Sequence, residues 1–327
     1  MRILDFHNHY YPPEYIAAIR EGPSAYTVSV DDDGNPVLHS PGDKNYIVPG
    51  HRDIGVRTQV LDDAGIDMQV LTFTAPGTLI ETPARSVELA ALANDCLATI
   101  VRDRSDRYTA LGTLPLNEPG ACASEFDRVL DELALPGVML FGNVNGVALS
   151  DERFWPLYER ASDKNAVLYI HPNFPPGVEA MEEYWLMPLV GFMFDTTLAA
   201  AGLVFSGVVE RFPGITWVLG HLGGAIPYLV ERLDRGFEAY PECREHISKP
   251  PSEYLKAFYY DTVNFDPAAL RLAIEFAGAD HILAGSDYPH LIGSLGKMVD
   301  SLTAVNVTDA DREKIYGGNA RRILGVS

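Results

Sequence analysis

The sequence is poor in cysteine and in basic residues. Three cysteines occur among 327 residues, and no two stand at the close spacing of a metal-binding pair, so no disulfide framework is expected. Lysine and arginine number 25 against 45 acidic residues, giving a formal net charge of -20. Such a charge repels phosphate backbones and anionic membrane surfaces. We therefore predict that the protein binds neither nucleic acid nor membranes.

Long uninterrupted apolar runs are also missing. A strongly apolar stretch from Leu186 to Phe205 is broken by Pro188 and carries Asp195 in its middle, so no membrane span is predicted. The N-terminus lacks the longer apolar region and cleavage site of a secretory signal, and the low cysteine count fits a reducing compartment. Together these features predict a cytoplasmic location.

Short apolar runs followed by a loop and a segment with helical spacing recur along the chain. The runs are Ile3 to Phe6, Met68 to Phe73, Tyr108 to Leu114, Gly137 to Phe141, Val167 to Ile170, Ile215 to Leu219, Phe258 to Tyr260, and Ile282 to Ala284. The helical segments include Ala84 to Asp103, Pro119 to Ala134, Glu152 to Asn165, Ala225 to Ala239, and Pro267 to Ala277. Continuous rather than alternating apolar strands indicate burial on both faces, as in parallel sheets covered by helices.

Eight such units predict an α/β fold, a (β/α)8 TIM barrel formed by residues 1–327 as a single domain. A doubly wound sheet is the competing architecture, and its usual sign is a glycine-rich phosphate turn after the first strand. No such turn follows any strand here. Two insertions, residues 10–52 and 173–197, interrupt the pattern, and we expect both to lie over the C-terminal mouth of the barrel.

The metal-capable side chains fall at the ends of the predicted strands. His7 and His9 end the first strand and His171 ends the fifth, whereas His221 and Asp287 follow the sixth and the eighth. Because the carboxyl ends of parallel barrel strands meet at one rim, all five are expected around the same mouth.

The first of these motifs, His7-Asn8-His9, places two imidazoles on one side of an extended segment, where they can share a cation. A third nitrogen from His171 and a carboxylate oxygen from Asp287 complete a ligand set suited to Zn²⁺, with Mn²⁺ or Fe²⁺ as alternatives. Each side chain alone also has a structural explanation. Their joint placement predicts one divalent metal site.

Four motifs resemble those of the amidohydrolase superfamily, specifically the branch that contains aminocarboxymuconate semialdehyde decarboxylase. They are His7-Asn8-His9, His171-Pro172, His221-Leu222-Gly223-Gly224-Ala225 and Gly285-Ser286-Asp287-Tyr288-Pro289, and a tail typical of the group runs from Gly318 to Gly325. The branch contains decarboxylases together with hydratases and C–C or lactone hydrolases.

The resemblance implies that His7, His9, His171 and Asp287 are metal ligands and that His221 is the catalytic acid/base. Many larger amidohydrolases bridge two metals with a modified lysine after the fourth strand. Here that strand ends in Leu140-Phe141-Gly142-Asn143, which favours one metal.

Several further residues are candidates for substrate binding. By resemblance, Arg57 binds a substrate carboxylate, and Arg232 reaches the site of a neighbouring subunit, which would make the enzyme a homodimer. The alternatives are a solvated helix residue for Arg57 and local salt bridges for Arg232. His51 and His290 either border the pocket or lie in exposed loops. The aromatic residues of the second insertion, including Trp185 and Phe192, either wall a pocket for a flat ring or pack the insertion onto the barrel, which we favour.

Two reactions use this ligand set. The first is non-oxidative decarboxylation of an aromatic or conjugated carboxylic acid, in which His221 or Asp287 delivers the proton. The second is hydrolysis or hydration by metal-activated water. We favour decarboxylation from the resemblance and the two arginines. A non-catalytic metal-binding barrel is the third hypothesis, and the spare His221 argues against it.

Overall fold

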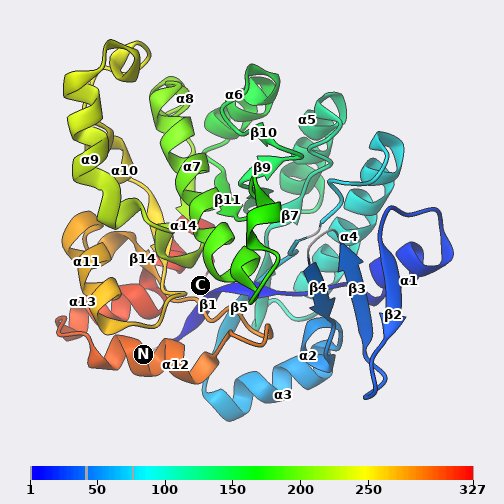
Figure 1. The fold of residues 1–327 in the computed structure, drawn as a ribbon. Coiled ribbons are helices and arrows are strands. Elements are labelled where there is room, and N and C mark those ends of the chain that lie inside the picture. The colour runs from blue at the N-terminus through cyan, green and yellow to red at the C-terminus, as the bar shows by residue number, and fades with distance from the viewer. Residues whose placement is uncertain (1, 41–42, 76, 327) are drawn as a thin grey trace.

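Eight strand positions line the centre of the molecule, and each overlaps one of the predicted apolar runs (Figure 1). The computed structural model describes residues 2–40, 43–75 and 77–326. The barrel strands are β1 (Leu4–His9), β5 (Met68–Thr72), β6 (Tyr108–Ala110) with its continuation β7 (Gly112–Thr113), β8 (Gly137–Phe141), β11 (Val167–His171), β12 (Thr216–Leu219), β13 (Tyr259–Asp261) and β14 (Ile282–Leu283).

These strands are parallel and close into a barrel. Hydrogen bonding follows the order β1-β5-β6 in one sheet and β7-β8-β11-β12-β13-β14 in the other, and only Leu111 separates β6 from β7. The backbone N–H of Phe6 donates to the carbonyl of Ala284 at 2.7 Å, which joins the last strand to the first. The predicted (β/α)8 TIM barrel is therefore confirmed.

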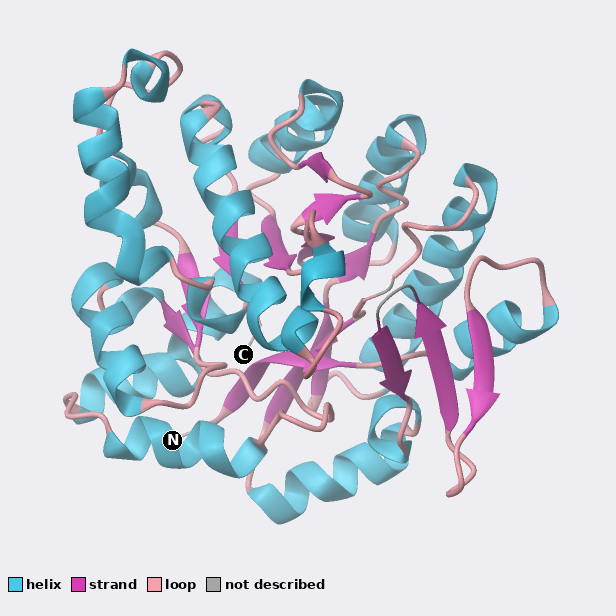
Figure 2. Ribbon diagram, viewed as in Figure 1, coloured by secondary structure: helices cyan, strands magenta, loops and turns pink. Residues whose placement is uncertain are grey.

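Helices surround the strands, as Figure 2 shows. They are α3 (Ile54–Ala64), α4 (Pro83–Asp103), α5 (Pro119–Asp127) with η1 (Arg128–Glu132), α6 (Trp155–Asp163), α7 (Phe192–Phe205), α8 (Val208–Arg211), α9 (Ile226–Ala239), α10 (Pro251–Leu255), α11 (Pro267–Ala277), α12 (Leu295–Ala304), α13 (Asp309–Glu313), η8 (Lys314–Gly318) and α14 (Asn319–Leu324). Thr82, Asp266 and Ser294 each accept a backbone N–H at a helix start. These caps satisfy donors that have no partner within the helix.

The barrel core is apolar because its strands are covered on both sides. Every residue of β8 and β11 is buried, including the ligand candidate His171 at the end of β11. A fully buried strand cannot leave its C-terminal polar side chains in bulk water. Polar residues at these strand ends are therefore held by one another or by a ligand.

The first insertion forms a layer beside the barrel (Figure 1). It contains α1 (Pro13–Glu21), α2 (Pro49–Arg52), and an antiparallel sheet of β2 (Thr27–Val30), β3 (Pro36–Ser40) and β4 (Asp43–Tyr46). The second insertion contains η3 (Val178–Met181) and η4 (Met187–Gly191), and the latter runs directly into α7. Both insertions contribute walls to the cavity described below.

The remaining short elements connect the barrel units. They are β9 (Asn143–Val144), β10 (Val147–Ala148), η2 (Glu152–Phe154), η5 (His221–Gly223), η6 (Pro241–Arg244) and η7 (Ala279–His281). Residues 1, 41–42, 76 and 327, which belong to the predicted single domain, lie outside the described residues.

One helical segment, Met187–Phe205, is long and apolar enough by composition to span a membrane. In the structure 44% of its most apolar window is buried within the protein, and it forms the helix that follows β11. Asp195 in this segment is buried and accepts hydrogen bonds from Asn143 and Asn173. This helix is thus part of the barrel architecture.

Candidate active site

The structure brings the predicted metal ligands together at the C-terminal mouth of the barrel. His7 Nε2 lies 3.1 Å from His9 Nε2, and Asp287 Oδ1 lies 3.4 Å and 3.1 Å from these two nitrogens. The ring centroid of His171 is 5.4 Å from that of His7 and 4.8 Å from that of His9. The side chains come from β1, β11 and the segment after β14, as the strand-end argument predicts.

These distances fit a shared cation. Donors about 2.1 Å from a metal ion lie about 3.0–3.4 Å from one another in octahedral or tetrahedral coordination. His7, His9 and Asp287 form one group whose ligand atoms all lie within 4.8 Å of one another, and His7 forms another with His171 and His221. The donor set of imidazole nitrogens and a carboxylate oxygen is therefore that of a divalent metal site.

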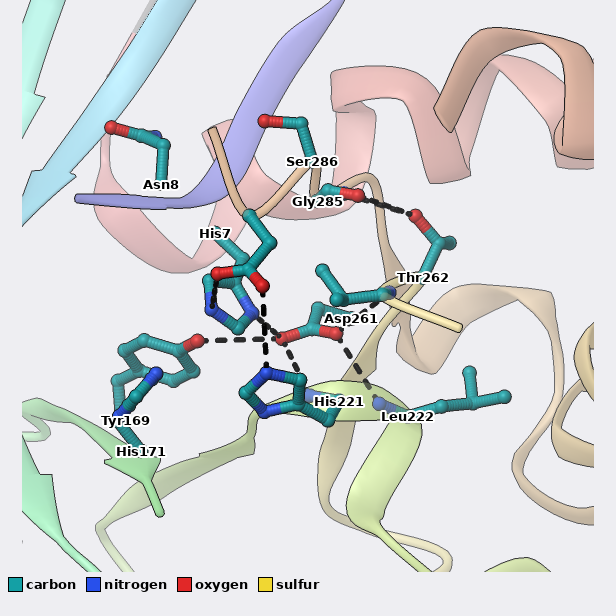
Figure 3. Close-up of polar contacts among 12 residues, drawn as sticks. His7, Asn8, Tyr169, His171, His221, Leu222, Asp261, Thr262, Gly285 and Ser286 are labelled. Atoms are coloured by element: carbon teal, nitrogen blue, oxygen red, sulfur yellow. Dashed lines mark hydrogen bonds and ion pairs between the residues drawn. The ribbon is translucent and has the colours of Figure 1, made fainter. Parts of the chain in front are cut away.

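Asp261, at the end of β13, is a site residue that the sequence analysis missed. Its Oδ2 lies 2.6 Å from Nδ1 of His7, and both side chains are fully buried. A hydrogen bond from Nδ1–H to this carboxylate leaves Nε2 of His7 facing the other predicted ligands. Figure 3 shows the Asp261 carboxylate between His7 and the turn that begins at His221.

The same carboxylate holds that turn. Asp261 accepts backbone N–H bonds from His221 at 3.1 Å and from Leu222 at 3.2 Å. Both of these residues have positive φ angles, 52° and 57°, which non-glycine residues rarely adopt. The two bonds hold the strained turn that places the His221 ring beside the ligands.

His221 faces Asp287 and is not one of the four predicted metal ligands. Its Nε2 lies 3.8 Å from Asp287 Oδ2. Its Nδ1 is buried and has no hydrogen-bond partner among the residues that the structure describes. A buried imidazole next to a ligand carboxylate is well placed to hold or pass a proton.

The electrostatics of His9, His171 and Asp287 match the protonation states of metal ligands. Burial holds the pKa values of His9 and His171 well below their usual value, so both rings are neutral. Burial opposes ionisation of Asp287, but contacts with His221, His7 and His9 hold its pKa well below the usual value. Burial also opposes charge on His7, but the adjacent Asp261 raises its pKa to about 10. The His7 ring therefore holds a proton that a cation would have to displace from Nε2.

A cavity of about 690 Å³ opens above these residues. This is within the range of about 300–1,000 Å³ that is typical of small-molecule sites. His171, His221 and Asp287 line it, together with a largely apolar group: Tyr184, Trp185, Leu189, Phe192, Phe265, Leu291 and Ile292. Trp185 and Phe192 thus wall the pocket, as one of the two interpretations of the second insertion predicts. The cationic side chains that line it are Lys44 and Lys297.

Arg57 lies elsewhere. Its side chain is fully buried beneath β1, and its guanidinium donates to Asn8 Oδ1, Gln69 Oε1 and the carbonyls of Gly50 and His9. It is not among the residues that line the cavity. The substrate-binding role predicted for Arg57 does not fit this position, and neither does the solvated alternative.

The other substrate-binding candidates are placed differently. His290 lines the cavity, and its ring centroid is 4.8 Å from that of the predicted ligand His9. The ring centroid of His51 lies 5.0 Å from that of His290. The His51 side chain has an exposed fraction of 1%, and neither of its ring nitrogens has a hydrogen-bond partner among the described residues. Arg232 is exposed on α9 and does not line the cavity of its own chain.

The amidohydrolase family model matches residues 4–326. The chain is 33% identical over 279 residues to 2-amino-3-carboxymuconate-6-semialdehyde decarboxylase of Dictyostelium discoideum, an alignment that covers 84% of this chain and 77% of that protein.

Two solved structures are similar along the whole chain. The 5-carboxyvanillate decarboxylase of Sphingomonas paucimobilis has a TM-score of 0.87 and 26% identity, with 100% of this chain and 99% of that one covered. The dihydroxybenzoic acid decarboxylase of Polaromonas sp. JS666, solved with manganese and 2-nitroresorcinol, has a TM-score of 0.83 and 25% identity, with coverage of 99% and 97%.

The barrel and its histidine-aspartate mouth define a TIM-barrel enzyme with a divalent metal site. More particularly, the chain belongs to the amidohydrolase family, because the family model matches nearly all of it. The resemblance predicted from the four motifs is thereby confirmed.

Proposed function

We propose that this protein is a metal-dependent decarboxylase that removes a carboxylate, without oxidation, from an aromatic or conjugated acid. The observation that carries the proposal is the position of His221, a spare imidazole 3.8 Å from the carboxylate of Asp287 at the floor of an aromatic-walled cavity. The similar proteins described above are named as decarboxylases of such acids, which supports the choice of reaction.

Four residues, His7, His9, His171 and Asp287, are proposed to hold the metal. A divalent cation bound there supplies positive charge that attracts the carboxylate and stabilises negative charge on neighbouring oxygens. Three nitrogens and one carboxylate oxygen suit Zn²⁺, which we propose as the resident ion, and Mn²⁺ and Fe²⁺ accept the same donors.

Proton delivery is the task of His221, with the ionised carboxylate of Asp287 facing its Nε2. The pair transfers one proton, held on the imidazole, to the carbon that carries the carboxylate. The electron pair of the bond between that carbon and the carboxylate then returns to the ring, and carbon dioxide leaves. One proton is consumed and one carbon–hydrogen bond is formed, so no oxidant is needed. Trp185 and Phe192 limit the access of water and offer faces for a flat ring.

Substrate contacts are proposed for His290 and His51. His290 lines the cavity next to the proposed ligand His9. We propose that it contacts an oxygen substituent beside the carboxylate. His51 packs against His290 and supports it from behind. The substrate is a small-molecule carboxylate, and residues 1–327 act as one domain in a cytoplasmic enzyme.

A homodimer is part of the proposal. Apolar side chains are exposed on η4 and α7, including Leu189, Phe194 and Leu198, and Tyr228 on α9 is 79% exposed. A second copy of the chain would bury such a surface. Arg232 lies four residues after Tyr228 and so shares its helix face. It would then face the partner, where it can supply positive charge to the partner's site.

The reaction is tested with metal-loaded enzyme in H₂¹⁸O and a panel of hydroxybenzoates and conjugated semialdehyde acids. Trapped carbon dioxide with no ¹⁸O in the organic product is the expected result. Incorporation of ¹⁸O into the product without carbon dioxide would select hydrolysis instead. The same measurement on His221→Asn gives the background rate of the metal site without its acid/base.

A further inference from the structure

Two buried charges beneath the metal ligands have no direct ionic partner. The Arg57 guanidinium and the Asp5 carboxylate are both fully buried, and neither forms an ion pair within the part of the chain that the structure describes. Gln69 bridges them, because its Oε1 accepts from Arg57 Nη1 at 2.8 Å and its Nε2 donates to Asp5 Oδ2 at 2.7 Å. Isolated buried charges are costly, so this bridge and its neighbours must hold both groups.

The bridge continues to the segment that carries the ligand Asp287. Ser286 donates to Asp5 through its Oγ at 2.6 Å and through its backbone N–H at 3.0 Å. The Oγ of Ser286 also accepts the N–H of Tyr288 at 3.1 Å. Asp287 therefore lies between two residues whose positions this hydroxyl determines.

The other end of the bridge reaches the strand that carries His7 and His9. Arg57 donates to the Asn8 side chain at 2.8 Å and to the carbonyl of His9. Asn8 lies between the two histidines and donates to the backbone carbonyls of Asp5 and Val70. The network thus contacts the backbone of β1 at His9 and the backbone at Ser286, next to Asp287.

We propose that Arg57, Gln69, Asp5 and Ser286 form a positioning network that sets the spacing between the β1 ligands and Asp287, so that metal affinity depends on side chains that touch neither metal nor substrate. The amide of Gln69 can accept from Arg57 and donate to Asp5 in only one orientation. The network therefore has one low-energy arrangement. This inference concerns the metal site alone and does not require the decarboxylase reaction.

The test uses the full-length protein stripped of metal and titrated with Mn²⁺, with the free ion measured by electron paramagnetic resonance. Ser286→Ala removes the hydroxyl, and Ser286→Thr restores one. The matched control is Ser301→Ala, another buried serine, whose hydroxyl donates to the Met298 carbonyl on α12. Arg57→Lys tests the other end, because it keeps the charge and loses the planar donor geometry.

We expect Ser286→Ala and Arg57→Lys to raise the Kd for Mn²⁺ by about tenfold or more, the usual effect of losing groups that support metal ligands. Ser286→Thr should recover most of the affinity, and Ser301→Ala should leave it unchanged. The increase in unfolding temperature on adding Mn²⁺ should shrink in parallel. An unchanged Kd with a lower unfolding temperature, or failure of both variants to fold, would assign the network to fold stability and overturn the proposal. Loss of Mn²⁺ affinity in a protein that releases no carbon dioxide would support the network and count against the proposed reaction only.

Discussion

His7 Nδ1 lies 2.6 Å from Oδ2 of Asp261, and both side chains are fully buried. The pair fixes which nitrogen of His7 faces the other ligands, and the same carboxylate accepts the backbone N–H groups of His221 and Leu222. A single side chain on β13 therefore orients one proposed metal ligand and the proposed acid/base. We therefore expect metal binding to depend on Asp261 as well as on the ligands themselves.

Replacing the Asp261 carboxylate should weaken metal binding. In Asp261→Asn the amide cannot accept all the N–H bonds that the two carboxylate oxygens accept, and the charge that fixes the His7 tautomer is lost. We expect the Kd for Mn²⁺ to rise about 10–100-fold, measured by titration of the metal-free protein. Asp266→Asn provides a control in a helix-capping aspartate outside the site. Equal affinities in Asp261→Asn and the wild type would contradict this role.

Substitutions of the proposed acid/base and of a proposed ligand should affect metal affinity and turnover differently. His221→Asn should bind metal with wild-type affinity and lose about 10²–10⁴-fold in kcat, the usual contribution of a positioned proton donor. Asp287→Ala should weaken both metal binding and turnover. Metal content after dialysis and initial rates with a substrate found in the panel distinguish the two. Full activity of His221→Asn would remove this residue from the reaction.

If Arg232 completes the active site of the partner subunit, mixing two inactive variants should restore activity. In a dimer of His221→Asn with Arg232→Ala, one of the two sites has both an intact His221 and an intact partner arginine. Because half of the molecules in an equal, freely exchanging mixture are mixed dimers, about a quarter of the wild-type activity should return. The rate is measured before and after subunit exchange. No recovery, with dimers shown by light scattering, would place Arg232 outside the partner's site.

The buried Asp195 predicts a pH dependence of stability. Burial raises its pKa from 3.8 to about 6, against hydrogen bonds from Asn173 and Asn143. Between these values the folded state holds a proton that the unfolded state has lost, so the stability from this group falls as the pH rises from about 4 to 6. Above this window the ionised carboxyl costs about 3 kcal/mol.

Asp195→Asn removes this titration. Relative to the wild type, its free energy of unfolding should therefore improve by up to about 3 kcal/mol between pH 4 and pH 7. Chemical denaturation of the metal-free proteins at both pH values gives this difference, with Asp300→Asn, on the surface of α12, as the control. A change of opposite sign would show that the carboxylate is stabilised in the folded state.

The barrel and the ligand positions could be predicted because their causes are local in the sequence. Strands covered on both faces leave continuous apolar runs, and β8 and β11 are buried throughout. Parallel strands then carry their terminal residues to the same rim, which brings His7, His171 and Asp287 together without further information.

The supporting residues could not be predicted in the same way. The seventh apolar run ended at Tyr260, one residue before Asp261, and an acidic residue after a strand is an ordinary finding in a chain with 45 of them. Helical spacing places Arg57 on α3 but does not say on which side of the barrel wall its guanidinium ends. Its acceptors lie between 7 and 49 positions away, so only the closed fold shows that it donates to Asn8 and to the backbone of His9.

The position of a bound ion decides whether these four side chains form a metal site. Crystals of the enzyme loaded with Zn²⁺ or Mn²⁺ should give one strong anomalous peak at the absorption edge of that metal. We expect this peak to lie about 2.0–2.2 Å from His7 Nε2, His9 Nε2, His171 Nε2 and a carboxylate oxygen of Asp287. No peak at the barrel mouth, or a peak held by other residues, would contradict it.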